Sequence, residues 1–542
     1  MLGYIHFDRA GIRNHQCEML VSRERIDDLV RNRYVVITSP ASVTTRRPKQ
    51  YLARFVEGPF FAPEELSRES ALSQTAILHG DRFPVIPNYY AVGGIEILGE
   101  LDGDRVVGSS SRPAPQSVVE DIEPDRLCDL LGIRGDATLG RIDGYDDLRM
   151  MLDTEDKTVL PRNVGIFGTV GSGKTNTSQA LIEEAARSGY AVVVLDVEGE
   201  YVVMDSPSEQ KALHPHIRSY GLMPKGLADF HVYHPHKTET ARKDGKATAF
   251  KLRIADLDHL VLAELIDASE PQERRLLEVL EHLERNPPRG AGTKGEAPSS
   301  LRDVLSHGES SDTKYTLKDI IDEISARVSG GGSHGAPAKG TDLSSYLALR
   351  SKLWKLARSN AFDAPNTEPI VPQKLVVAGR VSVFDVSYTS DRVKNLVIAE
   401  LLRSVFDYKV ENADAAKTLI FIEEAHTFIS ADRVGKMQET VEMLREIARR
   451  GRKRWLGLVF VSQQPGHLPS EIFELCNTRI VHNVKSIANL RAMKATGGDV
   501  SEEMWNLVPS LGVGQAVVST PQYRDPVVVN VRPCVTMRQF VE

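Results

Sequence analysis

One glycine-rich stretch of the chain has the spacing of a phosphate-binding loop. The run Gly168-Thr-Val-Gly-Ser-Gly-Lys-Thr175 fits the pattern G-x-x-x-x-G-K-[ST]. Glycines let backbone N–H groups curl around phosphates, and the N-terminus of a following helix adds a positive dipole end. Lys174 would reach the β- and γ-phosphates of ATP, and the Thr175 hydroxyl would bind Mg²⁺. The residues expected to bind the nucleotide are Gly168, Thr169, Val170, Gly171, Ser172, Gly173, Lys174, Thr175 and Asn176.

Two adjacent carboxylates follow a second apolar run. Leu419-Ile-Phe-Ile422 ends in Glu423 and Glu424, which is the Walker B pattern of nucleotide-hydrolysing enzymes. We expect Glu423 to hold Mg²⁺ through water and Glu424 to polarise the attacking water. A solvated acidic strand end is the alternative, and the presence of the phosphate loop disfavours it. A chance glycine turn is the corresponding alternative for the loop, which the strand before it and the helix after it disfavour.

A glutamine stands at the end of a third apolar run. Gln463 follows Ser462, and Gln464 and Pro465 come next. This place at the end of a sheet strand suits a sensor of the γ-phosphate, so Gln463 is the candidate and Gln464 the reserve. A glutamine there is often only a turn residue, but the two preceding motifs favour the functional interpretation.

A basic run precedes this glutamine. Six basic residues lie between positions 445 and 454, more than a solvated helix end needs for its dipole. In a ring ATPase, an arginine from one subunit stabilises transition-state charge at the γ-phosphate of its neighbour. Arg452 or Arg449 would take this catalytic role, with a slight preference for Arg452.

An acidic run follows the predicted strand after the phosphate loop. Asp196 and Glu198 belong to the stretch Leu195-Asp-Val-Glu-Gly-Glu-Tyr201. Ligands collect at the carboxyl edge of open α/β sheets, so either carboxylate would touch the outer shell of a metal. A turn with solvated acids is an equally good interpretation.

The elements that must position these residues alternate between strand and helix. Such alternation predicts a parallel sheet with helices on both faces. The expected strands are Val164–Phe167, Ala191–Asp196, Val381–Val386, Thr418–Ile422 and Leu456–Ser462. The expected helices are Lys174 to about Ser188, Arg392–Tyr408 and Val434–Arg450, the last with Met437, Val441, Leu444 and Ala448 on its buried stripe.

Two further regions flank or interrupt this sheet. Residues 1–145 contain short β-rich runs such as Tyr34–Thr38 and Tyr51–Val56, which predict a small barrel or sandwich, and a short helix near Asp125–Leu131. Residues 246–365 predict an inserted helical subdomain, with linkers at Asn286–Ser300 and Ser329–Gly340. Its expected helices are Leu257–Ile266, Gln272–Glu284, Leu317–Val328 and Leu343–Ser359, and Leu276, Leu277, Leu280 and Leu283 form the expected apolar stripe of the second.

Composition narrows the class of protein. The 542 residues are 41% hydrophobic and 26% charged, with a formal net charge of −7, as in ordinary globular proteins. No stretch approaches the ~20 apolar residues of a membrane span, so we expect a cytoplasmic protein without a membrane partner. The four cysteines are scattered, which argues against a disulfide framework and against zinc. Net negative charge does not exclude nucleic acid, because a channel needs positive charge only along its wall.

The motifs together resemble the HerA branch of the HerA–FtsK motor ATPases. The resemblance rests on the phosphate loop, on Asp196–Tyr201, Ile422–His426 and Gly451–Lys453, and on three runs nearer the end. Those three are Ser462–Pro465, Cys476–Arg479 and Leu511–Ala516. Two motifs depart from the family pattern, since Glu423 replaces an Asp and Val197-Glu198 replaces Pro-His. These departures concern metal ligation rather than the fold.

The resemblance implies a RecA-like ATPase core in a homohexameric ring that threads double-stranded DNA. The core would comprise residues 146–245 and 366–522, after a HAS-like barrel over residues 1–145. Residues 523–542 would be an extension that braces the neighbouring subunit. The resemblance also implies a separate partner, either a NurA-like nuclease for DNA end processing or a sirtuin-like or nuclease effector in anti-phage defence. The barrel would be the docking face for this partner. The stretch Thr44–Lys49 would lie on the docking face, contact DNA, or form only an exposed loop.

Three alternatives to a DNA-pumping ring compete with this interpretation. The ring would alternatively be a nucleotide-switched scaffold that activates a defence effector without obligatory DNA pumping. A conjugation or secretion ATPase is disfavoured because membrane-anchoring segments are absent from the sequence. An SMC-like or ABC ATPase is disfavoured because no LSGGQ-type signature occurs.

Overall fold

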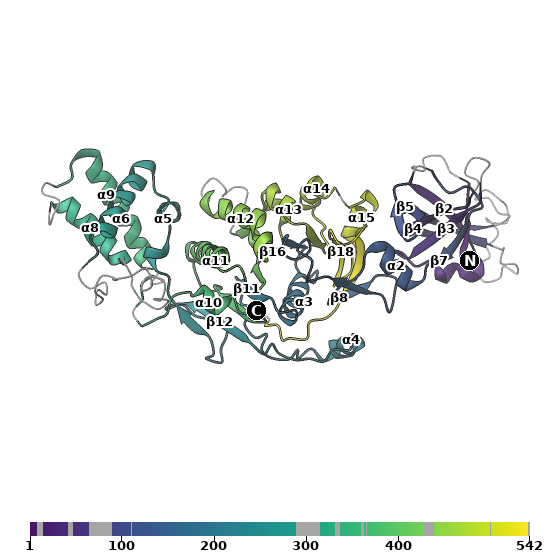
Figure 1. Ribbon diagram of the computed structural model, residues 1–542, viewed down its shortest axis with the longest axis horizontal. Coiled ribbons are helices and arrows are strands. Elements are labelled where there is room, and N and C mark those ends of the chain that lie inside the picture. The colour runs from purple at the N-terminus through teal and green to yellow at the C-terminus, as the bar shows by residue number, and fades with distance from the viewer. Residues whose placement is uncertain are drawn as a thin grey trace, which may run out of the picture. The chain divides into compact units, whose positions relative to one another are not determined.

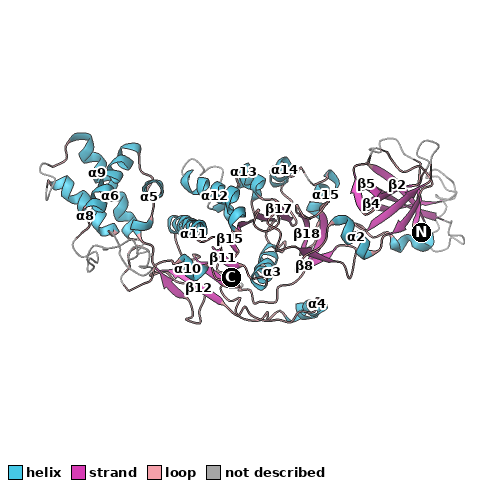
Figure 2. Cartoon of the chain, viewed as in Figure 1, coloured by secondary structure: helices cyan, strands magenta, loops and turns pink. Residues whose placement is uncertain are grey.

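The computed structural model describes residues 1–7, 15–41, 47–63, 89–109, 111–288, 315–330, 337–358, 362–364, 366–427, 438–498 and 500–539. The chain forms two compact units, each assembled from several stretches of sequence. The first comprises Met1–Glu155, Arg479–Lys485 and Gly497–Arg532. The second comprises Asp156–Thr478, Ser486–Thr496 and Pro533–Glu542. Each unit is described separately below (Figures 1 and 2).

The first unit begins with a closed β-barrel. Its strands follow the order β2-β1-β7-β3-β4-β5-β6, and β2 also pairs with β5, which closes the sheet. They are β1 Gly3–Ile5, β2 Gln16–Ser22, β3 Tyr34–Ser39, β4 Lys49–Pro63, β5 Tyr89–Asp102, β6 Arg105–Val107 and β7 Val118–Asp121. Alternating apolar residues, among them Ile37, Phe55 and Ile95, fill the interior. The structure therefore confirms a barrel rather than a sandwich for this region.

A short helix and an antiparallel ladder complete the first unit. Helix α2 spans Pro124–Leu131, as expected, and ends at Gly132 in the left-handed conformation. The ladder runs β17-β18-β19-β8-β9. Its strands are β8 Ala137–Ile142, β9 Arg149–Leu152, β17 Thr478–Val481, β18 Gln515–Ser519 and β19 Val527–Val531, and α15 Glu502–Leu507 precedes β18.

The second unit contains a parallel sheet in the order β13-β12-β14-β11-β15-β16-β10. These strands are β10 Val164–Phe167, β11 Ala191–Asp196, β12 Phe230–Pro235, β13 Thr248–Phe250, β14 Val381–Asp385, β15 Thr418–Ile422 and β16 Leu456–Ser462. Strands β10, β11, β15 and β16 are buried at every position, as expected for a sheet covered on both faces. The five predicted strands are confirmed, whereas β12 and β13 were not anticipated.

Helices of the second unit flank this sheet or form the insertion. Helix α3 packs on β10 and β11, and α12 packs on β16. The helices outside the insertion are α3 Lys174–Arg187, α4 His214–Ser219, α10 Pro372–Leu375, α11 Asp391–Glu411, α12 Gln438–Arg450, α13 Ser470–Leu475 and α14 Ile487–Thr496, and the 3₁₀ turn η8 spans Gly451–Arg454. The insertion contains α5 His259–Leu265, α6 Glu270–Arg285, α8 Leu317–Ser329 and α9 Gly340–Ala357.

Two details of the predicted helices are wrong. In α6 the buried stripe consists of Leu276, Val279, Leu280 and Leu283, whereas Leu277 is 36% exposed. In α12 Ile447, rather than Ala448, joins Val441 and Leu444 in the core. The stripe follows the 3.6-residue period, so a position one residue off the axis turns outward. Met437, most of the linker Asn286–Ser300 and half of the linker Ser329–Gly340 lie outside the described residues.

Two other expectations concern the stretch Thr44–Lys49 and membrane-spanning segments. In the stretch Thr44–Lys49, positions 44–46 lie outside the described residues, and Lys49 pairs with Glu100 at 2.8 Å. None of the helices in the described ranges is long and apolar enough to cross a membrane.

Candidate nucleotide site

The loop between β10 and α3 folds around its own lysine. Gly171 and Gly173 have φ values of 73° and 112°, in the region that favours glycine. The Nζ of Lys174 donates to the carbonyl oxygen of Thr169 at 3.0 Å, and the Ser172 hydroxyl donates to the same oxygen at 2.7 Å. Lys174 is 5% exposed. Because this acceptor is a neutral carbonyl, a charged phosphate oxygen can replace it with a stronger hydrogen bond.

The two carboxylates after β15, a strand that β16 separates from β10 in the sheet, act electrostatically on this lysine. Glu423 and Glu424 are 5% and 4% exposed. Burial lowers the pKa of Lys174, and the charges of Glu424 and Glu423 oppose this change. Burial also raises the pKa of Glu423 well above its usual value, with the charge of Glu424 acting in the same direction. The site is therefore built to receive additional positive charge.

Glu424 has an unusual backbone and an incompletely bonded carboxylate. Its φ is 46°, which is uncommon for a residue with a side chain. Its Oε2 accepts from the backbone N–H of Gln463 at 3.4 Å and lies 3.1 Å from Nδ1 of His426. Its Oε1 is buried and has no hydrogen-bond partner among the described residues. A buried acceptor without a donor costs about 1–3 kcal/mol, so this oxygen is suited to bind water or a hydrated cation.

The donors at this edge fit Mg²⁺. Hydroxyl and carboxylate oxygens are the ligands that Mg²⁺ prefers, and it usually keeps several waters and binds substrate phosphates as well. Thr175, half-buried in the first turn of α3, supplies the hydroxyl. Glu423 and the unbonded Oε1 of Glu424 supply the carboxylates.

The acidic run after β11 is a structural turn. Asp196 accepts from the backbone N–H groups of Gly199, Glu200 and Tyr201, at 2.7, 3.2 and 2.8 Å. Its side chain is fully buried. Burial raises the pKa of Asp196 to about 7, although the Tyr201 N–H opposes this. The turn interpretation therefore holds for Asp196, and Glu198 is the exposed carboxylate of this run.

Two family models match this chain, and both describe one family. The model described as the central domain of helicase HerA matches residues 137–405, and the HerA-like C-terminal model matches residues 378–537. Together they include the phosphate loop, both carboxylates and Gln463. The chain belongs to the HerA family. The resemblance deduced from the motifs is thus confirmed, and the protein is a P-loop ATPase.

Curated HerA relatives match most of the chain. It is 23% identical over 461 residues to the probable DNA double-strand break repair helicase HerA of Methanocaldococcus jannaschii, covering 81% of this chain and 85% of that protein. It is 24% identical over 487 residues to the DNA double-strand break repair helicase HerA of Pyrococcus furiosus, covering 82% and 78%. The structure resembles VirB4 of Thermoanaerobacter pseudethanolicus with a TM-score of 0.50 and 14% identity, covering 73% and 96%. This likeness supports the P-loop ATPase fold.

Three arginines of the basic run have partners within this HerA chain. They are held by carboxylates one turn away or by the carbonyl end of a neighbouring helix. The pairs are Arg445 with Glu442 at 3.1 Å, Arg450 with Glu446 at 2.5 Å, and Arg454 with the backbone oxygens of Lys409 and Val410 at 3.3 and 2.6 Å. These arginines stabilise α12 and the end of α11.

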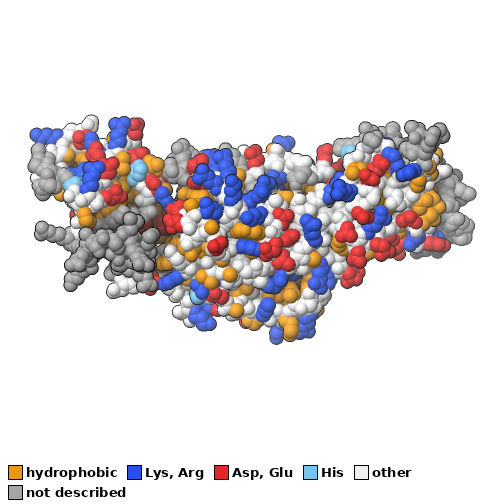
Figure 3. Space-filling model, in the orientation of Figure 1, with side chains coloured by type: hydrophobic (Ala, Val, Ile, Leu, Met, Phe, Trp, Pro, Cys, Tyr) orange, Lys and Arg blue, Asp and Glu red, His pale blue; other side chains and the backbone are white. Residues whose placement is uncertain are grey.

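Arg449 and Arg452 differ from those three. Arg449 is exposed and Arg452 is half-buried. In the described part of the chain neither forms an ion pair, and neither contacts the phosphate loop or Glu424. Lysine and arginine side chains gather over α12 on the face shown in Figure 3. Among the described residues, no hydrogen bond or ion pair joins either predicted finger arginine to the nucleotide site of the same chain.

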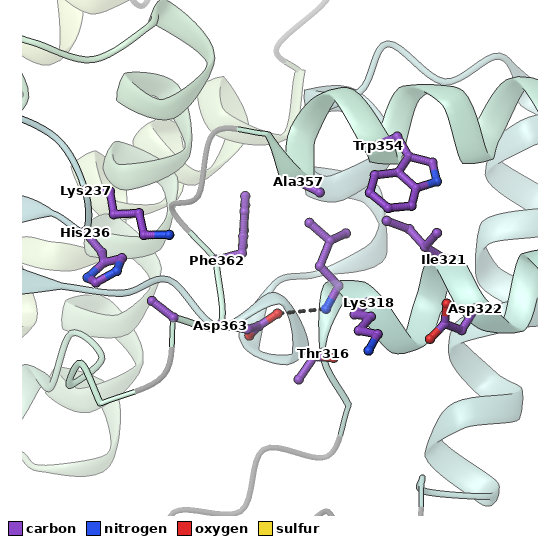
Figure 4. Close-up of a pocket in the computed structure, with 12 residues that line it drawn as sticks. His236, Lys237, Thr316, Lys318, Ile321, Asp322, Trp354, Ala357, Phe362 and Asp363 are labelled. Carbon is purple, nitrogen blue, oxygen red and sulfur yellow. Dashed lines mark hydrogen bonds between the residues drawn. The ribbon is translucent and has the colours of Figure 1, made fainter.

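The HerA chain also has a cavity of about 520 Å³ in and beside its helical insertion. Figure 4 shows His236 and Lys237 on one side and Trp354 on the other. Asp363 is committed to structure there, since it accepts from the backbone N–H of Leu317 at 2.7 Å. No residue of the phosphate loop lines this cavity, so it is separate from the nucleotide site.

Three side chains around the carboxylates were not predicted. The Tyr201 hydroxyl donates to Oε2 of Glu423 at 2.8 Å. His426 lies between Glu424 and Ser462, with its Nδ1 at 3.2 Å from the Ser462 hydroxyl. That hydroxyl accepts from the backbone N–H of Gln464 at 3.2 Å. All three belong to motifs seen in the sequence, but their partners depend on which strands become neighbours.

Proposed function

We propose that this protein is the subunit of a homohexameric ring that uses ATP hydrolysis to move along double-stranded DNA. The observation that carries the proposal is the joint match of two HerA models to residues 137–537, over which the structure brings the phosphate loop and the two carboxylates together. The matched relatives are described as DNA double-strand break repair helicases, which favours DNA as the substrate.

The proposed roles follow the geometry of the site. Gly168–Asn176 would hold the phosphates, and Lys174 would exchange the Thr169 carbonyl for a phosphate oxygen. Thr175 and Glu423 would hold Mg²⁺, which when bound would offset the phosphate charge. Glu424 would orient the attacking water through its unbonded Oε1. Gln463 donates its backbone N–H to Glu424, a place from which it can report the state of the γ-phosphate.

An arginine finger in trans completes the proposed motor. Arg449 and Arg452 are the candidates, because the other arginines of the basic run have partners in their own subunit. If a neighbouring subunit supplies the arginine, ATP hydrolysis requires the assembled ring.

The remaining parts of the chain would serve partners. The barrel of residues 1–145 would dock a separate NurA-like nuclease for DNA repair, or a sirtuin-like or nuclease effector for antiviral defence. The core would comprise residues 146–245 and 366–522, interrupted by the insertion at 246–365. The resemblance implies that residues 523–542 brace the neighbouring subunit, but β19 pairs with β18 and β8 of the same chain, and Val535 and Thr536 bind Glu183 of α3. We therefore do not carry this expectation into the proposal.

The test is ATP hydrolysis by the purified full chain with and without linear duplex DNA, at two salt concentrations. We expect DNA to stimulate turnover, with less stimulation at high salt because phosphate contacts release counterions. Lys174→Ala should abolish the turnover. Turnover that ignores DNA would instead support a nucleotide-switched scaffold that activates its effector without pumping.

Mixed rings test the finger. Arg452→Ala and Lys174→Ala subunits should each be inactive alone. A mixture should regain activity, because an intact loop in one subunit can meet an intact arginine in the other. Arg450→Ala, whose side chain pairs with Glu446, is the matched control and should stay active alone. Failure of the mixture would move the finger to Arg449, tested in the same way, or exclude a finger in this run.

A further inference from the structure

The last described segment of the chain is bound to the phosphate-loop helix of the same subunit. Oε1 of Glu183, in α3, accepts from the backbone N–H groups of Val535 and Thr536 at 2.8 and 2.9 Å and from the Thr536 hydroxyl at 2.8 Å. Glu183 is 6% exposed and Thr536 is fully buried. Three hydrogen bonds to one buried carboxylate oxygen make this a built contact rather than a loose tail.

A turn after β11 holds the same segment from the other side. The backbone N–H of Ser208 donates to Val535 O at 3.0 Å, and the N–H of Met537 donates to Ser206 O at 2.8 Å. The segment 533–539, here called the C-terminal strap, therefore lies between α3 and the 206–208 turn. Its backbone is ordered by partners on both sides.

The two ends of the strap contact the nucleotide site. At one end the Cys534 N–H donates to Oδ1 of Asn176 at 2.9 Å, two residues after Lys174. At the other end Nη2 of Arg538 lies 2.5 Å from Oε1 of Glu200. Glu200 belongs to the turn that Asp196 organises, and the next residue of that turn, Tyr201, donates to Glu423. The strap thus connects the start of α3 to the carboxylate side of the site.

Carboxylates outnumber Lys174 at this site. The carboxylates whose charges act on Lys174 are Glu424, Glu423, Glu200 and Glu198. A polyphosphate brings further negative charge to the same place. Arg538 pairs with Glu200, and its charge also acts on Glu198. Removing it would leave the incoming phosphates facing an unbalanced acidic group.

We propose that Arg538 is a positioning residue of the nucleotide site, supplied by the C-terminal strap of the same subunit, which holds and neutralises Glu200 so that the site accepts an anionic nucleotide. The proposal concerns nucleotide binding alone and does not depend on DNA or on a finger in trans.

The test compares nucleotide affinity and turnover in the full chain. For Arg538→Ala we expect the Kd for Mg·ADP, measured by calorimetry, and the KM for ATP to rise about 3- to 10-fold, the size of one partly screened charge interaction. The kcat should stay within about twofold, since Arg538 does not touch the reacting atoms. Arg538→Lys should recover most of the affinity.

A double-mutant cycle on Arg538 and Glu200 separates charge neutralisation from a merely structural role. Glu200→Gln removes the same ion pair but also one negative charge, so we expect its Kd to be unchanged or lower. The double variant Arg538→Ala/Glu200→Gln should return close to the wild-type Kd. If the pair only held the fold together, both single variants would bind nucleotide equally poorly and the double would be no better.

The control is Arg187→Ala. It removes the 2.6 Å ion pair between Arg187 and Glu184, which lies at the C-terminal end of α3. It should leave Kd and KM unchanged. Glu200→Gln binding as weakly as Arg538→Ala, or Arg538→Ala binding like the wild type, would overturn the proposal. Should Arg538→Ala fail to fold, Arg538→Lys and Glu200→Gln still decide it, since a Glu200→Gln chain that binds several-fold more weakly contradicts charge balancing.

Discussion

The acidic turns after β11 and β15 begin side by side and serve different purposes. Leu195 and Ile422 are partners in the parallel ladder, so Asp196 and Glu423 stand at the same sheet edge. Asp196 receives three backbone N–H groups on its two oxygens. Glu424 keeps one oxygen unbonded and sits on a left-handed backbone.

From this difference we infer a structural role for Asp196, and we take it as support for the proposed catalytic role of Glu424. Asp196 has its acceptor capacity used by the turn that it shapes, and such saturation leaves little for a metal or water. Glu424 retains an unused acceptor in a buried place, a cost that persists only where the surrounding structure enforces it. Residue type and position in the sheet are similar, so the local backbone donors decide the role.

The largest expected effect tests the proposed catalytic role of Glu424. Glu424→Gln should lower kcat for ATP by about 10²- to 10⁴-fold, since general base catalysis is lost, with ADP affinity and thermal stability nearly unchanged. Steady-state hydrolysis and calorimetry measure this. Glu446→Gln, a glutamate of α12 whose oxygen faces Arg450, is the control. If Glu424→Gln kept more than a tenth of the turnover, the base would have to be Glu423.

A third buried carboxyl, Glu400, lies away from the nucleotide site and affects the free energy of unfolding. Glu400 in α11 has a buried Oε2 without a partner among the described residues. Burial raises its pKa from 4.5 to about 7, reinforced by Asp256 and opposed by Arg403 and Arg253. The folded-state pKa lies above the unfolded one, so this group's stabilisation is complete below about pH 4.5 and lost as pH rises to about 7.

Glu400→Gln should therefore match the wild type near pH 4.5 and be more stable at pH 8. At about 1.4 kcal/mol per pKa unit the difference in the free energy of unfolding reaches at most about 3.5 kcal/mol. Urea unfolding at the two pH values measures it. Glu442→Gln, at an exposed glutamate, should show no such pH dependence. A constant difference across this range would mean that Glu400 is ionised in the folded protein.

The smallest expected effect concerns the structural turn. Asp196→Asn places an amide N–H₂ where one oxygen accepts a backbone N–H, so a buried donor loses its acceptor. We expect the free energy of unfolding to fall by about 2 kcal/mol, while kcat per folded molecule drops far less than in Glu424→Gln. Urea unfolding and turnover of the same samples test this. A large loss of kcat with unchanged stability would mean that Asp196 acts in catalysis rather than in the structure of the turn.

Local sequence predicted much of the fold because its strongest signals are local. Strands such as Val164–Phe167 and Thr418–Ile422 are short apolar runs in a doubly covered sheet, and their bounds match the structure. Strand β12 was missed because His231 and His234 interrupt its apolar character. One member of the predicted α6 stripe is wrong, Leu277 in place of Val279, because leucine at 277 satisfies composition but not the helical period.

The sequence by itself determined the phosphate loop, the adjacent carboxylates and the HerA resemblance, since each is a run of neighbouring residues whose chemistry depends on its own spacing. Only the tertiary structure decided which carboxylate has an unused oxygen. It also decided that Tyr201 binds Glu423 across 222 positions and that Arg538 reaches Glu200 across 338. The physical reason is that hydrogen bonds and charge pairs act over a few ångströms in space. Which strands and segments come that close is set by the packing of the whole sheet and not by any one motif.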